Sequence, residues 1–178
     1  MHLETDRLIL RPLELEDAAV IQELVSARAI AETTLNIPHP YPAGAAETFI
    51  RQSNERREQG AAYTFGIIRT ADSTFLGCVG LQVHQEYERA EMGYWIGVPY
   101  WNQGYTTEAV RRIIDFGFSY LSLNRIYATY FTGNVASRRV MEKAGMVYEA
   151  TLPQHVRRFD RFHDLGYCGI LRAMWLPR

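Results

Sequence analysis

A glycine-containing turn is the part of this sequence whose chemistry is easiest to specify. The apolar stretch Arg89–Val98 runs into this turn, and a helical pattern over Thr107–Leu121 follows it closely. The first N–H groups of a helix have no acceptor within the helix, and the helix dipole adds partial positive charge there. Gly104 in the turn allows a ligand to approach the backbone closely. The pattern therefore predicts a site for a phosphate-bearing ligand.

Composition narrows the class of protein that carries this turn. The 178 residues have a formal net charge of -1, which gives no argument for binding nucleic acid or an anionic membrane. No apolar run approaches the ~20 residues needed to span a bilayer, and the N-terminus lacks the form of a signal peptide. Cys78 and Cys168 each lie in an apolar segment, which favours reduced thiols and a cytoplasmic location. We expect one domain over residues 1–178.

The first half of the chain predicts helices followed by an antiparallel meander. Three prolines within Ile37–Pro42 exclude regular structure and indicate a loop. Gly60 marks the end of the second helix. The expected elements are a strand at Leu8–Arg11, helices at Ala18–Val25 and Ala45–Gln59, and strands at Ala62–Ile68, Phe75–Val83 and Arg89–Val98.

The second half predicts a crossover connection. Apolar residues in Thr107–Leu121 recur at helical spacing, and Arg125–Phe131 follows as a strand, so this strand should run parallel to Arg89–Val98. A short helix is expected at Asn134–Lys143, closed by Gly145. The last two strands are expected at Met146–Leu152 and Phe162–Leu171, joined by the charged segment His155–Arg161. The sum is an α+β fold with a mixed sheet.

The two parallel strands place the candidate site. Ligands of such sheets bind at the carboxyl ends of parallel strands. The glycine turn follows one of these ends and Asn134 follows the other, so we expect both to face one cleft.

Four segments, in this order, resemble one family over nearly the whole chain. The segments are Thr5–Arg11 (TDRLILR), Glu91–Ile96 (EMGYWI), Gly104–Ala109 (GYTTEA) and Asn134–Met146 (NVASRRVMEKAGM). Together they resemble the GNAT superfamily of acyl-CoA-dependent N-acetyltransferases, and most of all its ribosomal-protein alanine N-acetyltransferases. The resemblance implies a mostly antiparallel mixed sheet of about seven strands, helices on both faces, and a splayed central parallel pair.

The resemblance also implies acetyl-CoA as co-substrate. The family's pyrophosphate signature falls on Trp101–Thr106, where only the central Gly104 matches strictly. Asn102 stands where this branch often has glycine, and asparagine adopts positive φ more readily than most residues. The residues that the resemblance assigns to the coenzyme are Ile96, Gly97, Val98, Asn102, Gln103, Gly104, Tyr105, Thr106, Thr107, Asn134, Ser137 and Arg138.

Simpler structural roles stand beside these assignments. Asn134 is also a preferred helix N-cap, Gly104 could serve the turn alone, and Ser137 could satisfy a backbone donor in the first turn of its helix. The resemblance implies that the backbone of Ile96 and Val98 pairs with the pantetheine arm. On that basis the thioester lies between the splayed strands.

Acetyl transfer to an amine requires a base, an oxyanion donor and assistance to the leaving thiolate. Glu91 is the candidate base, with a solvated glutamate on the sheet face as the alternative. A backbone N–H near Ile96 is the expected oxyanion donor. Many family members have a tyrosine acid where this chain has Met141, so Ser137 is the candidate substitute.

The acceptor remains open between a protein N-terminal residue and a small amine such as a polyamine, an amino acid or an antibiotic. A non-catalytic acyl-CoA-binding module is the alternative from another class. A homodimer is implied by the resemblance only. His155, His163 and Asp164 do not match common zinc spacings, so no metal is expected. The run Arg157–Phe162 could steer an acidic substrate or form a solvated hairpin face.

Overall fold

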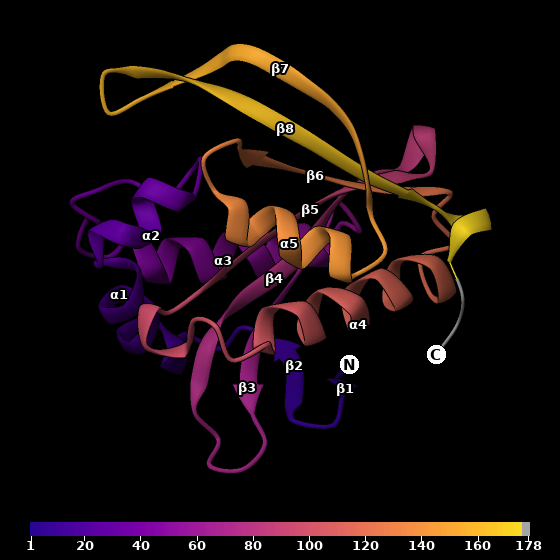
Figure 1. Ribbon diagram of the computed structural model, residues 1–178. Helices are drawn as coiled ribbons and strands as arrows, with labels where there is room; N and C mark the ends of the chain where they lie inside the picture. The colour runs from indigo at the N-terminus through magenta and orange to yellow at the C-terminus, as the bar shows by residue number, and fades with distance from the viewer. Residues whose placement is uncertain (176–178) are drawn as a thin grey trace.

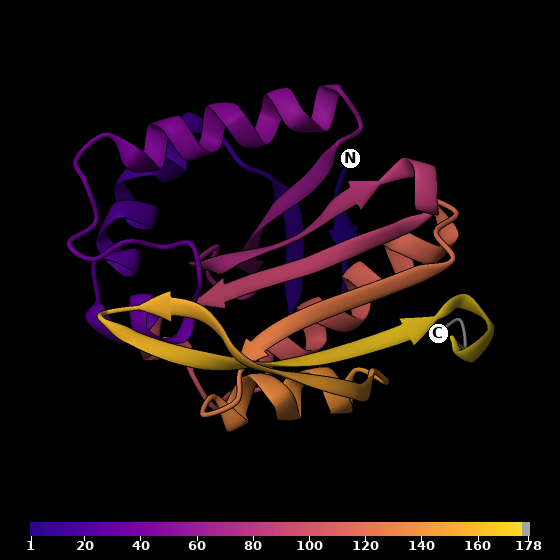
Figure 2. The same ribbon diagram turned by 90° about the horizontal axis from the view of Figure 1, so that it is seen from above.

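A mostly antiparallel sheet of eight strands forms the centre of the protein, with helices on both faces (Figures 1 and 2). The computed structural model describes residues 1–175. The strand order is β1-β2-β3-β4-β5-β6-β8-β7. The predicted α+β class is confirmed, and the additional strand is the two-residue β1 (Leu3–Glu4), which pairs with β2.

Most of the predicted elements are present, with bounds shifted by a few residues. The six-residue helix α2 was not predicted, because it is short and its N-cap, Ala27, gives no capping signal. The remaining elements are β2 (Leu8–Pro12), α1 (Ala18–Val25), α2 (Arg28–Thr33), α3 (Ala45–Glu58), β3 (Ala62–Arg69), β4 (Phe75–His84), β5 (Arg89–Ile96), α4 (Tyr105–Ser119), β6 (Arg125–Phe131), α5 (Val135–Lys143), β7 (Val147–Arg158) and β8 (Arg161–Leu171).

The prediction for the last two strands was wrong at their connection. The charged segment does not join the strands as a loop, because β7 continues to Arg158 and β8 already begins at Arg161. Only Phe159 and Asp160 form the turn, with φ of 48° and 58°. Two-residue turns with positive φ suit the twist of a hairpin. The strand pattern is hidden in the sequence because most side chains near the tip are exposed and charged.

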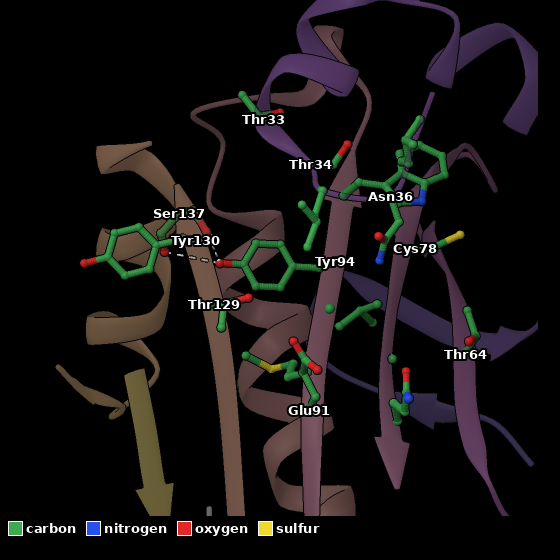
Figure 3. A pocket seen from close by; sticks show the side chains of 18 of the residues that line it. Thr33, Thr34, Asn36, Thr64, Cys78, Glu91, Tyr94, Thr129, Tyr130 and Ser137 are labelled. Atoms are coloured by element: carbon green, nitrogen blue, oxygen red, sulfur yellow. Dashed lines mark hydrogen bonds between the residues drawn. The ribbon is translucent and has the colours of Figure 1, made fainter. Parts of the chain in front are cut away.

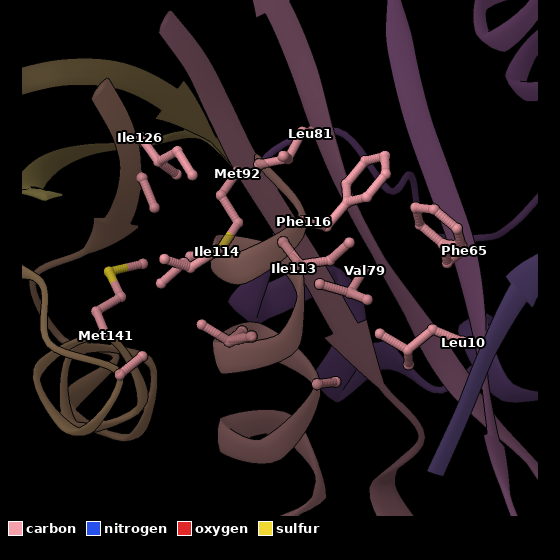
Figure 4. Packing of buried hydrophobic residues seen from close by; sticks show 14 of the residues in the cluster. Leu10, Phe65, Val79, Leu81, Met92, Ile113, Ile114, Phe116, Ile126 and Met141 are labelled. Atoms are coloured by element: carbon pink, nitrogen blue, oxygen red, sulfur yellow. The ribbon is translucent and has the colours of Figure 1, made fainter. Parts of the chain in front are cut away.

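Two hydrophobic clusters cover the two faces of the sheet. The larger one packs α4 and α5 against the strands, and the predicted apolar stripe of α4 is buried in it at Val110, Ile113, Ile114 and Gly117 (Figure 4). The smaller cluster lies under α1 and α3 and includes Ile21 and Ile50. The layers are visible in Figure 2, where α3 lies on one side of the sheet and α4 and α5 on the other.

The parallel pair β5 and β6 separates part of the way along its length. Pairing starts at Arg89↔Arg125 and ends at Glu91↔Tyr127. Beyond that point β5 stays paired with β4 as far as Ile96, and β6 stays paired with β8 as far as Phe131. The two strands diverge toward their carboxyl ends in Figure 2. The predicted splay is therefore confirmed, and it involves only the edge that these two strands share.

The Gly77→Ala substitution should destabilise the sheet next to the splay. A Cβ at Gly77 would lie 2.2 Å from the backbone oxygen of Trp95, which cannot move without displacing β5. We expect urea denaturation to show a loss of about 1–3 kcal/mol in the free energy of unfolding. Gly93→Ala is the matched control on β5, since a Cβ there meets no atom within 4 Å. Equal stability of the two variants would show that the Trp95 backbone places no steric limit on position 77.

Candidate active site

The turn before α4 has the geometry of an anion-binding loop. Asn102 has φ of 61° and Gly104 has φ of 83°, so the positive φ predicted for Asn102 is confirmed. Gly104 is the N-cap of α4, and the first helical bond runs from Glu108 N–H to the Gly104 carbonyl at 3.1 Å. The N–H groups of residues 105–107 precede that bond, so they have no acceptor within the helix. This backbone fits a diphosphate.

A network of hydrogen bonds holds the N-terminal segment against this turn. The Glu108 carboxylate accepts from the Thr5 hydroxyl at 2.6 Å and from Arg7 Nε at 2.7 Å. Arg7 also donates to the Gln103 carbonyl at 3.2 Å and lies 4.5 Å from the centre of the Tyr105 ring. Burial alone would raise the pKa of Glu108, but the bonds from Thr5 and Arg7 outweigh it and lower the pKa. The guanidinium of Arg7 therefore lies beside the turn.

A cavity of about 370 Å³ lies at the splay between β5 and β6. Its walls include Glu91 and Tyr94 from β5, Thr129 from β6 and Ser137 from α5 (Figure 3). The last residue of α2, Thr33, and the segment 34–37 that follows it line the cavity as well. The cavity therefore contains both candidate catalytic residues, Glu91 and Ser137.

Glu91 and Tyr94 lie on opposite faces of the sheet. Side chains alternate along a strand, so Glu91 shares a face with Trp95, which packs beside the α1–α3 cluster. Tyr94 shares the other face with Met92 and Ile96, which belong to the α4–α5 cluster. The splay is the place where groups on the two faces can reach a common point.

Two tyrosines lie close to Glu91. Tyr127 is its register partner on β6, and the Tyr127 and Tyr167 rings stack with their centres 5.0 Å apart. Burial, followed by the Glu91 carboxylate, raises the pKa of Tyr127, and burial with the neighbouring Tyr127 raises the pKa of Tyr167 to about 12. Both phenols stay protonated near neutral pH. This pair was not predicted from the sequence, although alternation along β6 places Tyr127 and Thr129 on one face.

The end of β5 presents backbone groups to the gap. Gly97 N–H donates to the Leu76 carbonyl at 2.8 Å, so this amide faces β4. Alternation then turns the backbone groups of Ile96 and Tyr94 the other way, toward the gap. The Ile96 carbonyl accepts from the Trp101 indole at 2.8 Å. Ile96 N–H is thus directed toward the gap. A Cβ at Gly97 would meet Leu24 at 2.8 Å, so this position also requires close packing.

Asn134 and Ser137 make local contacts at the start of α5. The Asn134 side-chain oxygen accepts from Ser137 N–H at 3.1 Å, which confirms the capping role. Its amide nitrogen donates to the Thr33 carbonyl at 3.4 Å. The Ser137 hydroxyl lies 2.8 Å from the Tyr94 hydroxyl, a contact that the sequence did not suggest. Arg138 is paired with Glu142 at 2.7 Å.

The tip of the β7–β8 hairpin contacts α2 and the segment that follows it. The Arg158 guanidinium donates to the carbonyls of Ala31 and Ile37, so it fixes the segment that follows α2. Arg157 points elsewhere and pairs with Asp160 at 3.1 Å in an exposed position. The basic run therefore divides between a structural contact and a solvated face.

The described residues can also be compared with what a metal site, a membrane span or a disulfide would require. Within residues 1–175, no three His, Cys, Asp or Glu side chains come together in a way that could hold a metal ion. Across the helices of that range, none has the length and apolar character needed to cross a membrane. Cys78 and Cys168 are both buried free thiols.

Comparison with known proteins identifies the family. Residues 7–147 match the family model of the acetyltransferase (GNAT) domain. The chain is 32% identical over 171 residues to the uncharacterized N-acetyltransferase p20 of Bacillus licheniformis, covering 96% of each. The protein belongs to the GNAT acetyltransferase family, and it is an acyl-CoA-dependent N-acetyltransferase that uses acetyl-CoA as acyl donor.

Two further similarities indicate how widely acceptors vary around this fold. A structure of RimL, a ribosomal L7/L12 alpha-N-protein acetyltransferase in complex with coenzyme A, superposes with a TM-score of 0.89 at 15% identity, covering 96% of this chain and 98% of that one. The spermidine N(1)-acetyltransferase of Vibrio cholerae is 23% identical over 173 residues, covering 97% of each chain. The first likeness concerns the fold alone.

The Gly104→Ala substitution should weaken binding of acetyl-CoA. A Cβ at this left-handed position strains the turn and projects from the backbone that would hold the diphosphate. We expect calorimetry to show an increase of about tenfold in Kd, which corresponds to ~1.4 kcal/mol.

Gly44→Ala is the matched control for this measurement. Gly44 is also a left-handed N-cap, with φ of 78°, but it precedes α3, on the opposite face of the sheet from α4. It should carry a similar strain and leave Kd unchanged. Equal losses of affinity in both variants would mean that the α4 turn has no special part in binding.

Proposed function

We propose that the protein transfers an acetyl group directly from acetyl-CoA to a primary amine within a ternary complex. The observation that carries this proposal is the splay of β5 from β6, with Glu91 on one face and Ser137 on the other. An amine can enter from the face of Glu91 while the coenzyme approaches from the side of α4 and α5. Family membership supports the same assignment of co-substrate.

Each catalytic task has a residue at the splay between β5 and β6. Glu91 accepts the proton of the amine, directly or through one water, because an ammonium has no lone pair with which to attack. The N–H of Ile96 stabilises negative charge that develops on the carbonyl oxygen. The Ser137 hydroxyl donates a hydrogen bond to the departing sulfur. When bound, acetyl-CoA supplies an activated acyl group, so no covalent nucleophile of the protein is needed.

The charge of the cavity favours an acceptor with a single ammonium group. Arg56 and Glu91 are the only charged residues that line it within the described residues. A polyamine carries several positive charges and would be repelled by Arg56 without a second carboxylate to offset it. The acidic lining that a polyamine site requires is therefore missing from these walls. The spermidine specificity named for one relative thus has no counterpart in this lining.

The apolar part of the cavity supports an N-terminal residue or an amino-acid-like amine. Ile21 and Val25 of α1, Ile37 after α2 and Phe49 of α3 line the face that Glu91 shares. These walls suit a compact aliphatic group next to the amine. We therefore propose a protein N-terminal residue as the acceptor, with a small monoamine as the alternative.

The Glu91→Gln substitution should abolish most of the acetyl transfer. The amide cannot take the proton of the amine, so kcat should fall by about a hundredfold or more. Free-thiol release with a peptide acceptor measures this rate. Glu86→Gln, on an exposed turn between β4 and β5, is the matched control and should leave kcat unchanged. A Glu91→Gln enzyme within twofold of the wild type would exclude Glu91 as the base.

A panel of acceptors should separate monoamines from polyamines. We expect kcat/KM for a peptide with a free N-terminus to exceed that for spermidine by about tenfold or more, a ratio that corresponds to ~1.4 kcal/mol. Arg56→Glu should narrow the gap by adding a carboxylate to the cavity. A wild-type preference for spermidine would contradict the proposed acceptor class.

A further inference from the structure

Tyr94 carries a polar group that the mechanism above leaves unused. It projects from β5 toward α5, and its hydroxyl reaches the start of that helix (Figure 3). Met141, which stands at the position of the common tyrosine acid, is buried and has no proton to donate. Tyr94 therefore places a hydroxyl on the α4–α5 side of the splay, in contact with Ser137, the residue proposed to donate a hydrogen bond to the leaving sulfur.

The contact geometry limits what this hydroxyl can do. Tyr94 Oη lies 2.8 Å from Ser137 Oγ and 3.2 Å from the Ser137 carbonyl oxygen. When Tyr94 donates to the carbonyl, the serine proton is free to point back at Tyr94. When Tyr94 donates to Oγ, the serine proton is free to point into the cavity. A negative charge developing in the cavity favours the second arrangement, because only that one directs an O–H toward it.

We propose that Tyr94 is a positioning residue that aims the Ser137 hydroxyl at the departing sulfur. The inference rests on the proposed function, because it assigns a sulfur atom to the space in front of Ser137. The Tyr94 ring is held by the α4–α5 cluster, so the phenol needs little further ordering to hold this geometry. Both hydrogen bonds of the Tyr94 hydroxyl go to Ser137, which ties it to that single residue.

Tyr94 and Ser137 donate hydrogen bonds and do not transfer a proton to the sulfur. Burial raises the pKa of Tyr94, since a phenolate there would be shielded from water. Tyr94 therefore remains protonated across the working range of pH. Glu91 takes one proton from the ammonium and releases it to water. The amine nitrogen then forms a bond to the carbonyl carbon and gives a second proton to Glu91, while the C–S bond breaks with its electron pair on sulfur. The sulfur later takes a proton from water, while Ser137 and Tyr94 keep theirs.

The test compares Tyr94→Phe, Ser137→Ala and the double variant. Tyr94→Phe should lower kcat about tenfold, the loss of one hydrogen bond to a developing charge, with KM for acetyl-CoA nearly unchanged. Because the two hydroxyls act in series, the double variant should lose no more than Ser137→Ala alone. Losses that multiply would show that Tyr94 acts independently of Ser137 and would overturn the inference.

A second measurement does not depend on turnover. Ultraviolet absorbance of the thiolate gives the thiol pKa of coenzyme A bound to each variant. Tyr94→Phe should raise that pKa by about one compared with the wild type, a tenfold change in the thiolate population. If Tyr94→Phe raises the thiol pKa although the wild type acetylates no amine, the proposed function is wrong and this inference stands. Normal turnover, with the same kcat and the same thiol pKa in the wild type and in Tyr94→Phe, would support the proposed function and overturn this inference.

Tyr63→Phe is the control for loss of a phenol hydroxyl elsewhere. Tyr63 is a partly buried β3 residue that packs on Phe116 at 5.4 Å between ring centres and is not among the residues that line the cavity. It should leave kcat and the thiol pKa unchanged. Thermal unfolding of every variant checks that the fold is retained, and a Tyr94→Phe defect that follows its loss of stability would assign Tyr94 a structural role only.

Discussion

The unpaired edge between β5 and β6 is the constraint on which the site depends. Each strand keeps its outer partner to the end, so the sheet stays intact while one internal edge opens. Backbone N–H and C=O groups buried without partners are costly, and a folded protein normally satisfies them. A bound chain with amides of its own can take the place of the missing strand. The opening therefore favours a ligand built like an extended peptide, which the pantetheine arm is.

Alternation along one strand separates the two halves of the proposed chemistry. Glu91 and Tyr94 are three residues apart and face opposite sides of the sheet, so each has its own environment. The glutamate lies among tyrosine phenols and apolar walls, and the tyrosine lies among the side chains under α4 and α5. The sheet thus separates the proposed removal of the proton from the proposed assistance to the thiolate. Only the reacting atoms need to meet within the gap.

The sequence was informative wherever a local pattern determines the structure. The spacing of Val110, Ile113 and Ile114 was enough to predict α4, and the crossover rule was enough to predict the parallel pair. The positive φ of Asn102 followed from the turn chemistry of asparagine. The splay itself came from the family resemblance, because no local pattern encodes where a ladder ends. What the sequence could not supply were contacts between distant segments. Tyr94 and Ser137 are 43 positions apart, and nothing in either residue predicts that their hydroxyls meet.

The matched family region ends at residue 147, where β7 begins. The hairpin beyond it nevertheless supplies Leu165 to the cavity wall and Arg158 to the segment that follows α2. Residues 7–147 contain the turn before α4 together with Glu91 and Ser137, while the hairpin that follows contributes Leu165 and Arg158. A substitution at Leu165 would therefore reshape the cavity wall without touching the turn before α4. The family match accordingly describes the reaction of this protein better than it describes the acceptor.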